Sequence, residues 1–412
     1  MRISLFTNEY PPNVYGGAGV HVEYLSRELA RADRGSHQVD VLCFGEQQET
    51  RGNLRVRGVS GPPPGVLPAQ DPRHERLLDA LFRDLAIVGK VERPDIVHCH
   101  TWYSHLAGCL ARPLTGARLV LTTHSLEPHR PWKVEQLGTA YNTTAWIERT
   151  AYQNADGVVA VSRAMKDDVQ ALYGVSPDKV RVIHNGIDPD EYRPPAKQDP
   201  ATLERLRVDP NTPMVLFVGR ITRQKGILHL VRAIRYLDPG VQVVLCAGAP
   251  DTKEIGEEMA TLVRQAQQDA RVPIVWIDEM LPKPDTIALY SQASVFVCPS
   301  VYEPFGIINL EAMACETPVV ASAVGGIPEI VVPDETGVLV AFEPESATSP
   351  EPKDPDGFSR ALAAAVNTLM ANPDRRLAMG KAARRRVLEH FSWRHIAEET
   401  IEFYRELVKT RA

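Results

Sequence analysis

The sequence has few cysteines, no long apolar run and no excess of positive charge. Its six cysteines in 412 residues include no C-x-x-C pair, so we expect reduced core residues rather than disulfides or a cysteine metal site. No apolar run approaches the roughly 18 residues of a membrane span. A strand expected at residues 3–7 follows the first methionine at once, so we expect no signal peptide. These absences predict a cytoplasmic protein with no membrane partner.

Acidic residues outnumber basic ones. There are 52 Asp and Glu against 46 Lys and Arg, a formal net charge of −6, whereas nonspecific nucleic-acid binding requires a basic face. We therefore expect no nucleic-acid partner. No Asp-x-Asp stands at a strand end, and His98, His100 and His105 alternate faces around one. We expect these histidines to line a cleft, and we expect no metal ion and no cofactor.

Short β-branched runs alternate with longer helical stretches, which is the pattern of parallel α/β units. Strands are expected at 3–7, 39–44, 96–99, 119–123, 158–161 and 180–183, and again at 215–218, 241–247, 274–277, 295–298, 319–321 and 338–340. Between the two series, residues 188–213 contain six prolines, which favours a linker with little regular structure. We expect an N-terminal domain over 1–190, a linker over 191–213, a C-terminal domain over 214–391 and a last helix over 392–412.

The most informative motif places two glutamates eight residues apart, directly after the strand expected at 295–298. A turn ending at Gly306 and a helix beginning near Ile307 are expected there. Free backbone N–H groups and the positive end of the helix dipole at such a point suit a diphosphate. Ionised carboxylates only accept hydrogen bonds, so Glu303 and Glu311 suit hydroxyl groups on a sugar and a ribose. Two solvated helix glutamates are the alternative.

Two cations follow the first strand of the second series. Arg220 and Lys225 come at its carboxyl end, where doubly wound sheets bind ligands. Breaking the glycosidic bond of a nucleotide sugar leaves a diphosphate that gains negative charge. A cation about 4 Å away stabilises that charge by roughly 4 kcal/mol at an effective dielectric of about 20. The pair is therefore a predicted leaving-group clamp, and two exposed basic residues in a loop are the alternative.

A glycine-rich loop follows the first strand of the chain. Gly17 and Gly19 precede a helix expected to begin near Val20. We expect them to let the backbone approach a second phosphate and the transferred sugar. The second expected strand ends at Cys43 and Phe44, so no acidic residue stands at its end, where a dinucleotide-binding fold carries one for the ribose about twenty residues after the loop. The loop alone is therefore a weak signal for a dinucleotide.

Together these motifs resemble those of retaining glycosyltransferases of family 4. That family has the GT-B fold, in which two Rossmann-like domains face across a cleft and a C-terminal helix returns to the N-terminal domain. The sequence around Glu303 and Glu311 is similar to its E-x7-E signature, and residues 219–226 are similar to its G-R-x-x-x-x-K-G motif. Residues 184–188 resemble its N-G-[IV]-D sequence, and residues 325–329 resemble its G-G-x-x-E turn.

Within the family, residues 9–21, 98–102 and 124–133 resemble the short bacterial glycogen synthases that use ADP-glucose, several of which are α-maltose-1-phosphate synthases. The resemblance implies a retaining, metal-independent glucosyltransferase of glycogen biosynthesis. Its donor would be ADP-glucose, and its acceptor glucose 1-phosphate or an α-1,4-glucan. A transferase with a mannose or N-acetylglucosamine donor, and a nucleotide-sugar-binding protein that has lost catalysis, are alternatives. A homo-oligomer stays open.

The resemblance also implies roles for single residues. His124 matches the active-site histidine of the family and would bind the primary hydroxyl of the donor sugar. Front-face attack is implied, in which the departing phosphate takes the acceptor's proton. The implied catalytic set is His124, Arg220, Lys225 and Glu303, and the implied donor-binding set is Gly17, Gly19, Arg220, Lys225, Glu303, Phe305, Gly306, Ile307, Ile308 and Glu311.

A basic cluster just beyond His124 is the candidate for binding an acceptor phosphate, because a neutral glucan has no charge to pair with it. A solvated loop is the alternative. The long glycogen and starch synthases carry a K-x-G-G motif, and Val14 stands here at the position of its lysine. The acceptor preference of the long enzymes is therefore not assumed for this chain. The predicted acceptor-binding residues are the cluster and two cleft residues, namely His129, Arg130, Lys133, His100 and Trp102.

Overall fold

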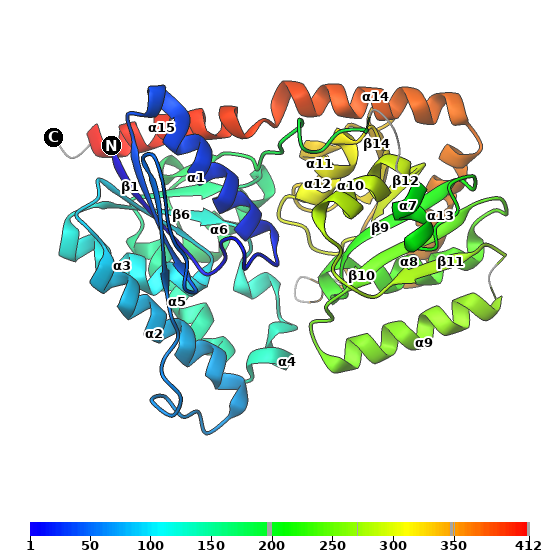
Figure 1. The fold of residues 1–412 in the computed structure, drawn as a ribbon. Helices are drawn as coiled ribbons and strands as arrows, with labels where there is room; N and C mark the ends of the chain where they lie inside the picture. Colours follow the sequence, from blue (N-terminus) through cyan, green and yellow to red (C-terminus); the bar gives the residue numbers. More distant parts are fainter. Residues whose placement is uncertain (196–199, 270, 347–348, 350, 410–412) are drawn as a thin grey trace. The chain divides into compact units, whose positions relative to one another are not determined.

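The computed structural model describes residues 1–195, 200–269, 271–346, 349 and 351–409 (Figure 1). These residues form two compact units. The first comprises Met1–Gly186 together with the final helix, and the second comprises Ile187–Ser392. Each unit has its own sheet and its own apolar core.

The sheet of the first unit has 8 strands in the order β3-β4-β2-β1-β5-β6-β7-β8. Neighbouring strands are parallel except β3 and β4. The strands are β1 (Arg2–Thr7), β2 (Gln38–Phe44), β3 (Gln48–Arg51), β4 (Leu54–Val59), β5 (Ile96–His100), β6 (Arg118–Thr123), β7 (Gly157–Ala160) and β8 (Val180–Val182). The strand order reverses at β1, which lies between β2 and β5. Doubly wound sheets bind ligands at the carboxyl ends of strands beside such a reversal.

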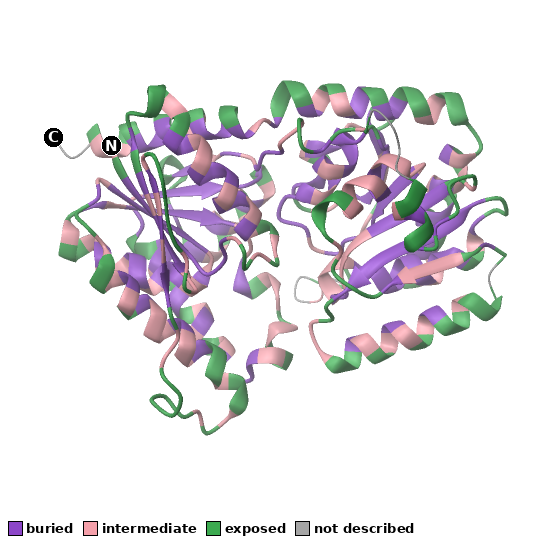
Figure 2. Ribbon diagram, in the orientation of Figure 1, coloured by how far each residue is buried: buried purple, intermediate pink, exposed green. Residues whose placement is uncertain are grey.

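Helices cover this sheet. They are α1 (Gly17–Gly35), α2 (Glu75–Lys90), α3 (His105–Thr115), α4 (Lys133–Leu137), α5 (Ala140–Asn154), α6 (Arg163–Tyr173) and α15 (Trp393–Lys409). Most strands are buried along almost their whole length, whereas the helices alternate buried and exposed residues (Figure 2). This is the burial expected when one stripe of each helix packs on a sheet.

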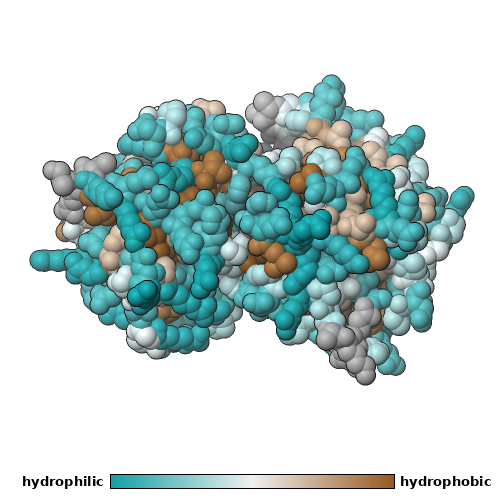
Figure 3. All heavy atoms as spheres, turned by 90° about the horizontal axis from the view of Figure 1, so that it is seen from above, coloured by the Kyte–Doolittle hydropathy of each residue, from teal (hydrophilic) through white to brown (hydrophobic). Residues whose placement is uncertain are grey.

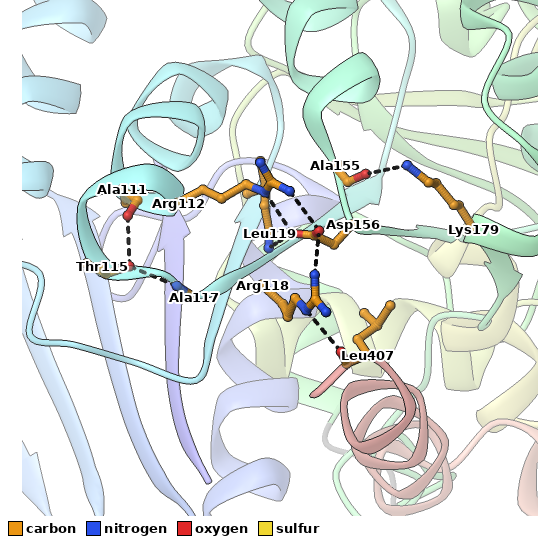
Figure 4. A network of polar contacts seen from close by, with 10 residues as sticks. All are labelled: Ala111, Arg112, Thr115, Ala117, Arg118, Leu119, Ala155, Asp156, Lys179 and Leu407. Atoms are coloured by element: carbon orange, nitrogen blue, oxygen red, sulfur yellow. Dashed lines mark hydrogen bonds and ion pairs between the residues drawn. The ribbon is translucent and has the colours of Figure 1, made fainter. Parts of the chain in front are cut away.

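The final helix, α15, returns to the first unit and lies beside α1 (Figure 1). The hydroxyl of Tyr404 on α15 is 2.5 Å from Nδ1 of His98 in β5. Arg118 of β6 donates from Nε to the carbonyl of Leu407 at 3.0 Å, and its Nη1 is 3.1 Å from Asp156 (Figure 4). These contacts confirm the returning helix that the family resemblance implied.

The sheet of the second unit has 6 strands in the order β11-β10-β9-β12-β13-β14, all parallel. The strands are β9 (Met214–Arg220), β10 (Gln242–Gly248), β11 (Ile274–Ile277), β12 (Val295–Cys298), β13 (Val319–Ser322) and β14 (Gly337–Val340). The helices are α7 (Pro200–Arg205), α8 (Ile227–Ala233), α9 (Lys253–Asp269), α10 (Lys283–Gln292), α11 (Ile307–Ala314), α12 (Ile327–Ile330), α13 (Pro355–Met370) and α14 (Pro373–His390). The strand order reverses between β9 and β12. The cation motif lies at the carboxyl end of β9, and the glutamate motif follows the carboxyl end of β12.

Every strand expected from the sequence is present, with ends within two residues of those expected. Two strands, β3 and β4, were missed. All residues of β3 are exposed and β4 interleaves arginines with apolar residues, so neither forms an apolar run. The stretch expected to have little structure contains α7, whose Leu203 is 3% exposed. A buried leucine explains why this part of the stretch folds as a helix.

Polar residues dominate the exposed face drawn in Figure 3, where apolar side chains occur in separate small groups. No helix in the described part of the chain combines the length and the hydropathy needed to cross a membrane.

Candidate active site

Three loops of the second unit meet at the carboxyl ends of β9, β12 and β13. The N–H of Val301, after β12, donates to the carbonyl of Gln224, after β9, at 3.0 Å. The N–H of Gly326, after β13, donates to the carbonyl of Glu303 at 3.0 Å. These backbone hydrogen bonds join the three family motifs into one surface, as the switch-point rule for parallel sheets predicts.

Two glycines allow the loops to approach so closely. Gly226 has a φ of +61°, and a Cβ there would lie 1.9 Å from the carbonyl oxygen of Pro299. Gly325 has a φ of +53°, and a Cβ there would lie 1.9 Å from the carbonyl oxygen of Glu303. Only glycine combines the left-handed conformation with the missing side chain. These contacts give a physical reason for the glycines of both motifs.

Lys225 and Glu303 form an ion pair on this surface. The Lys225 Nζ is 2.7 Å from Oε2 of Glu303, and the Ser300 hydroxyl donates to the same oxygen at 3.1 Å. Burial lowers the pKa of the Lys225 ammonium, but the charge and the hydrogen bond of Glu303, together with Cys298, outweigh that effect, so the pKa ends above its usual value. Lys225 is therefore a permanent cation held in one place.

Arg220 is the second cation of this surface. Its side chain is 34% exposed, and Nη2 lies 3.1 Å from Oδ1 of Asp251. By contrast, Arg223 lies 3.9 Å from Glu258 of α9, away from the Glu303 pair. Arg220 and Lys225 thus present two partly exposed cations, a guanidinium and an ammonium, as a clamp for a phosphate chain requires.

Glu311 lies on α11, with a tyrosine hydroxyl on each of its carboxylate oxygens. Tyr192 donates to Oε1 at 3.2 Å and Tyr290 donates to Oε2 at 2.9 Å. Burial raises the pKa of the Glu311 carboxyl, and the two hydroxyls act against this rise. Each carboxylate oxygen has a second lone pair, so Glu311 keeps acceptor capacity for a hydroxyl group. Neither tyrosine could be predicted from a motif in the sequence.

The turn before α11 ends as expected. Gly306 precedes the helix, and Ile307 and Ile308 begin it. The Phe305 side chain is 2% exposed, and its ring centroid lies 6.1 Å from that of Phe391. The Phe305 side chain therefore anchors the turn in the core, which leaves the backbone for contact with a ligand.

Three histidine rings gather in the first unit. His21 comes from α1, His100 ends β5, and His124 directly follows β6. The His124 ring centroid is 4.8 Å from that of His21 and 5.3 Å from that of His100. Burial lowers the pKa of His21 to about 4 and holds the pKa of His124 well below its usual value. At neutral pH these imidazoles are uncharged, so His124 is suited to hydrogen bonding rather than to carrying a positive charge.

The other two histidines expected to line a cleft lie in the core. Both ring nitrogens of His98 are occupied, by the Tyr404 hydroxyl at 2.5 Å and the Thr122 hydroxyl at 2.7 Å. His105 is 1% exposed, and its ring centroid lies 5.9 Å from that of Tyr152. The expectation was wrong for these two because both are packed from all sides by other elements.

His21 is a further residue that sequence reasoning missed. Its Nδ1 lies 2.6 Å from Oδ1 of Asn185, which belongs to the motif at residues 184–188. A Cβ on the next residue, Gly186, would lie 2.8 Å from the ring of Trp393. The motif therefore holds α1 and α15 in the first unit and orients His21, which the motif alone did not reveal.

The glycine-rich loop of the first unit encloses a carboxylate. Oε2 of Glu9 accepts hydrogen bonds from the N–H groups of Tyr15 at 3.1 Å and Gly16 at 2.8 Å. A Cβ on Gly19 would lie 2.8 Å from the same side chain, while Gly17 is exposed at the start of α1. Helix α1 begins at Gly17, earlier than the Val20 expected, and the Glu9 carboxylate fixes the loop just before it.

The three basic residues of the cluster, His129, Arg130 and Lys133, differ in their contacts. Lys133 donates from Nζ to Oε1 of Gln136 at 2.7 Å, near the protein surface. His129 has its Nδ1 3.4 Å from Asp168. Arg130 has Nη1 3.5 Å from Oε1 of Glu127, a carboxylate whose side chain is only 2% exposed. Arg130 therefore neutralises a buried charge, while Lys133 donates to the neutral side-chain amide of Gln136.

His100 and Trp102 were predicted to bind the acceptor, and both are buried. His100 is 0% exposed and Trp102 is 5% exposed. The Trp102 ring packs in an apolar cluster with Leu77, Leu137 and others. In this structure neither side chain exposes enough surface for direct contact with an acceptor. His100 could still affect acceptor binding indirectly, because its Nδ1 lies 3.0 Å from Nε2 of His124.

Comparisons with known proteins agree with these motifs. The family model described as Glycosyltransferase Family 4 matches residues 15–191, and the one described as Glycosyl transferases group 1 matches residues 199–386. The chain is 49% identical to an alpha-maltose-1-phosphate synthase of Mycolicibacterium smegmatis, over 99% of this chain and 100% of the relative. It is 30% identical to a glycogen synthase of Mycobacterium tuberculosis, over 98% and 94% of the two chains.

Among solved structures, a sucrose-phosphate synthase from Thermosynechococcus elongatus matches with a TM-score of 0.79 and 28% identity, over the whole of both chains. That match, with two Rossmann-like units and the returning helix, gives the GT-B fold. The matched family models and relatives span the two units and all the motifs described above. The chain belongs to glycosyltransferase family 4.

Proposed function

We propose that the chain transfers glucose from ADP-glucose to glucose 1-phosphate and forms maltose 1-phosphate with an α-1,4 linkage. The observation that carries the proposal is the assembled surface of the second unit. There a Lys225–Glu303 pair, whose carboxylate is buried, lies on loops fixed to each other by backbone hydrogen bonds. The similarity to alpha-maltose-1-phosphate synthases supports maltose 1-phosphate as the product.

In the proposed donor complex, the diphosphate lies on Arg220, Lys225 and the amino end of α11. These groups stabilise the charge that the leaving ADP gains as the bond to glucose breaks. Glu303 binds sugar hydroxyls and Glu311 binds the ribose, since both carboxylates accept hydrogen bonds. The N-terminal unit contributes His124, whose neutral imidazole binds the primary hydroxyl of the glucose, and the backbone at Gly17 and Gly19.

The proposed reaction retains the α configuration by front-face attack. A double displacement needs a carboxylate nucleophile below the anomeric carbon, and Glu303 is already bound by Lys225 and Ser300. In the proposed step, the acceptor hydroxyl forms the new bond to the anomeric carbon as the bond to ADP breaks. The departing phosphate oxygen takes the hydroxyl proton. The enzyme then contributes positioning and electrostatics, and no metal ion takes part.

An acceptor phosphate would bind to the basic cluster of the first unit. Lys133 is the cation best placed for this role, because Arg130 is paired with a buried carboxylate. An α-glucan is the second candidate acceptor, favoured by the similarity to a glycogen synthase. The two acceptors differ in charge, so one pair of assays separates them.

The test supplies purified protein with ADP-glucose, UDP-glucose or GDP-mannose, each with glucose 1-phosphate or with glycogen. Released nucleotide and the mass of the product are measured, and NMR coupling at the anomeric proton gives the configuration. We expect the highest kcat/KM for ADP-glucose with glucose 1-phosphate and an α-linked disaccharide phosphate. A β-linked product would overturn front-face retention, and preference for another donor or for glycogen alone would overturn that part of the proposal. Absence of any nucleotide release would favour a binding protein without catalysis.

A further inference from the structure

The histidine cluster of the first unit has the composition of a transition-metal site. His21, His100 and His124 each offer one ring nitrogen, and these three atoms lie within 4.8 Å of one another. The His21 ring is 1% exposed and the His100 ring is 0% exposed, whereas His124 is only partly buried. The cluster is therefore enclosed on the side of the core and accessible through His124.

The hydrogen bonds around the cluster leave lone pairs available. An amide oxygen only accepts, so the contact of His21 Nδ1 with Oδ1 of Asn185 at 2.6 Å places the ring proton on Nδ1. The lone pair of His21 is then on Nε2, a buried atom with no hydrogen-bond partner among the described residues. His100 likewise has a buried Nε2 without a partner there, while its Nδ1 lies 3.0 Å from Nε2 of His124.

We propose that His21, His100 and His124 bind Zn²⁺ or a similar divalent transition-metal ion, and that this ion inhibits the enzyme by occupying His124. Zinc prefers nitrogen ligands at about 2.0–2.1 Å, which places the nitrogens of a tetrahedral site about 3.4 Å apart. The present nitrogens lie within 4.8 Å of one another, so rotations of the histidine side chains would bring them to that spacing. Imidazoles alone favour zinc, copper or nickel over magnesium or calcium, which prefer oxygen ligands.

Of the five histidines in this region, three have ring nitrogens that converge, and the other two do not take part. His98 has both nitrogens occupied by the hydroxyls of Tyr404 and Thr122, and His105 is not part of the group whose nitrogens converge. Asn185 would act as an outer partner, because its hydrogen bond orients the His21 ring and favours metal binding through the other nitrogen. The inhibition rests on the proposed function, since it depends on the role of His124, but the binding does not.

The binding test uses the full chain after chelator treatment and removal of the chelator. ZnCl₂ is titrated by calorimetry, and CoCl₂ is titrated by visible absorption, which reports a tetrahedral site. We expect one ion per chain. His21→Ala should lower the zinc affinity at least about tenfold, and Asn185→Ala by about 10- to 100-fold, as the loss of an outer partner does in known sites. The matched control is His395→Ala, because His395 and Glu399 lie 3.7 Å apart on the surface of α15, and it should leave the affinity unchanged.

The activity test adds zinc to the glucosyl-transfer assay and then adds chelator. We expect inhibition that saturates with the binding curve and is reversed by the chelator.

A wild-type chain that binds no zinc, or equal affinity in the wild type and in a folded His21→Ala variant, overturns the site. Circular dichroism checks folding, and His124→Ala, at the accessible edge, replaces any variant that does not fold. Zinc binding without inhibition overturns the inhibitory role. A chain that binds zinc but transfers no glucose keeps the site and removes the proposed function instead.

Discussion

The Nζ of Lys225 lies 2.7 Å from Oε2 of Glu303, so a cation and an anion from two different loops meet before any donor is bound. The backbone hydrogen bond between Val301 and Gln224 fixes the same two loops. A group that is already in place loses no further freedom when a ligand binds, which is the condition for strong electrostatic stabilisation of a leaving group. The pair therefore provides the sharpest test of the donor surface.

The first prediction concerns this pair. Lys225→Ala and Glu303→Ala should each lower kcat by about a hundredfold or more, the loss typical of removing one preorganised electrostatic group. Because each residue holds the other, the double variant should lose much less than the product of the two single losses. Steady-state kinetics measure this, with Lys253→Ala on the exposed face of α9 as control. A Lys225→Ala enzyme close to wild type would remove the clamp.

The second prediction concerns Glu311. Glu311→Ala should weaken ADP binding at least as much as it slows turnover, since its proposed partner is the ribose and not the reacting centre. Tyr290→Phe should weaken ADP binding by a smaller factor, about tenfold or less, because it removes one neutral hydrogen bond from a charged group. Calorimetric titration with ADP gives the affinities. Tyr236→Phe, near Asp356 in the same unit, is the control and should bind ADP normally.

Much of the proposed donor surface, the three loops after β9, β12 and β13, could be located from the sequence because its signals are local. The apolar run of β12 is buried at every position, and a buried parallel strand has this continuous pattern. The glycines at 226 and 325 follow from backbone contacts that tolerate no side chain. The sequence therefore indicated where the loops after β9, β12 and β13 lie and which residues they present.

The histidine cluster could not be predicted in the same way, because its contacts join distant parts of the chain. His21 and Asn185 are 164 residues apart, and His98 and Tyr404 are 306 residues apart. No periodicity or spacing in either segment records such a contact. The same holds for Tyr192 and Glu311, which are 119 residues apart. Contacts of this kind also decide why His100 of β5 joins the cluster while His98 of the same strand is bound by Tyr404 in the core.

The third prediction is that glucosyl transfer does not need a divalent metal ion. Arg220, Lys225 and the amino end of α11 provide the positive charge that a metal would otherwise supply. Initial rates in excess chelator should equal those with added magnesium. A loss of activity in chelator that magnesium restores would contradict the assignment of these groups. A gain in activity on adding chelator does not contradict this assignment. It is the result expected if the purified protein carries inhibitory zinc that the chelator removes.

The fourth prediction concerns pH and a buried carboxyl beside the basic cluster. Burial, and then the charge of Glu127, raise the pKa of Glu148 to about 8 from an ordinary value of 4.5. Between these values the folded protein holds a proton that the unfolded chain has released, so this group makes stability fall as pH rises from about 4.5 to about 8. Each unit of pKa difference corresponds to about 1.4 kcal/mol. The Glu148→Gln variant carries no titrating proton at this position.

Melting temperatures of wild type and Glu148→Gln should therefore diverge with pH. The variant should gain stability relative to wild type as pH rises from 5 towards about 8, and the gain should level off above that value. Glu402→Gln, at an exposed position of α15, is the control and should give a pH-independent difference. A Glu148→Gln difference that is equally flat would show that this carboxyl is already ionised in the folded protein.

The fifth prediction separates the two cations of the basic cluster by what each does in the structure. Arg130 lies 3.5 Å from the buried carboxylate of Glu127. Removing one partner of a buried ion pair leaves an uncompensated charge, which costs about 3–5 kcal/mol. Arg130→Ala should therefore lower the melting temperature by several degrees as well as weaken acceptor binding, so its kinetics alone do not report on the acceptor.

Lys133 gives the cleaner measurement, because its Nζ donates to the neutral side chain of Gln136. Lys133→Ala should raise the KM for glucose 1-phosphate by about tenfold, the factor for roughly 1.4 kcal/mol of a charged hydrogen bond. The KM for ADP-glucose and the melting temperature should stay near wild type. Lys133→Arg, which keeps the charge, should restore most of the acceptor affinity, and Lys409→Ala at the exposed end of α15 should change nothing. A Lys133→Ala enzyme with an unchanged KM for glucose 1-phosphate would mean that this loop is solvated and that the acceptor phosphate binds elsewhere.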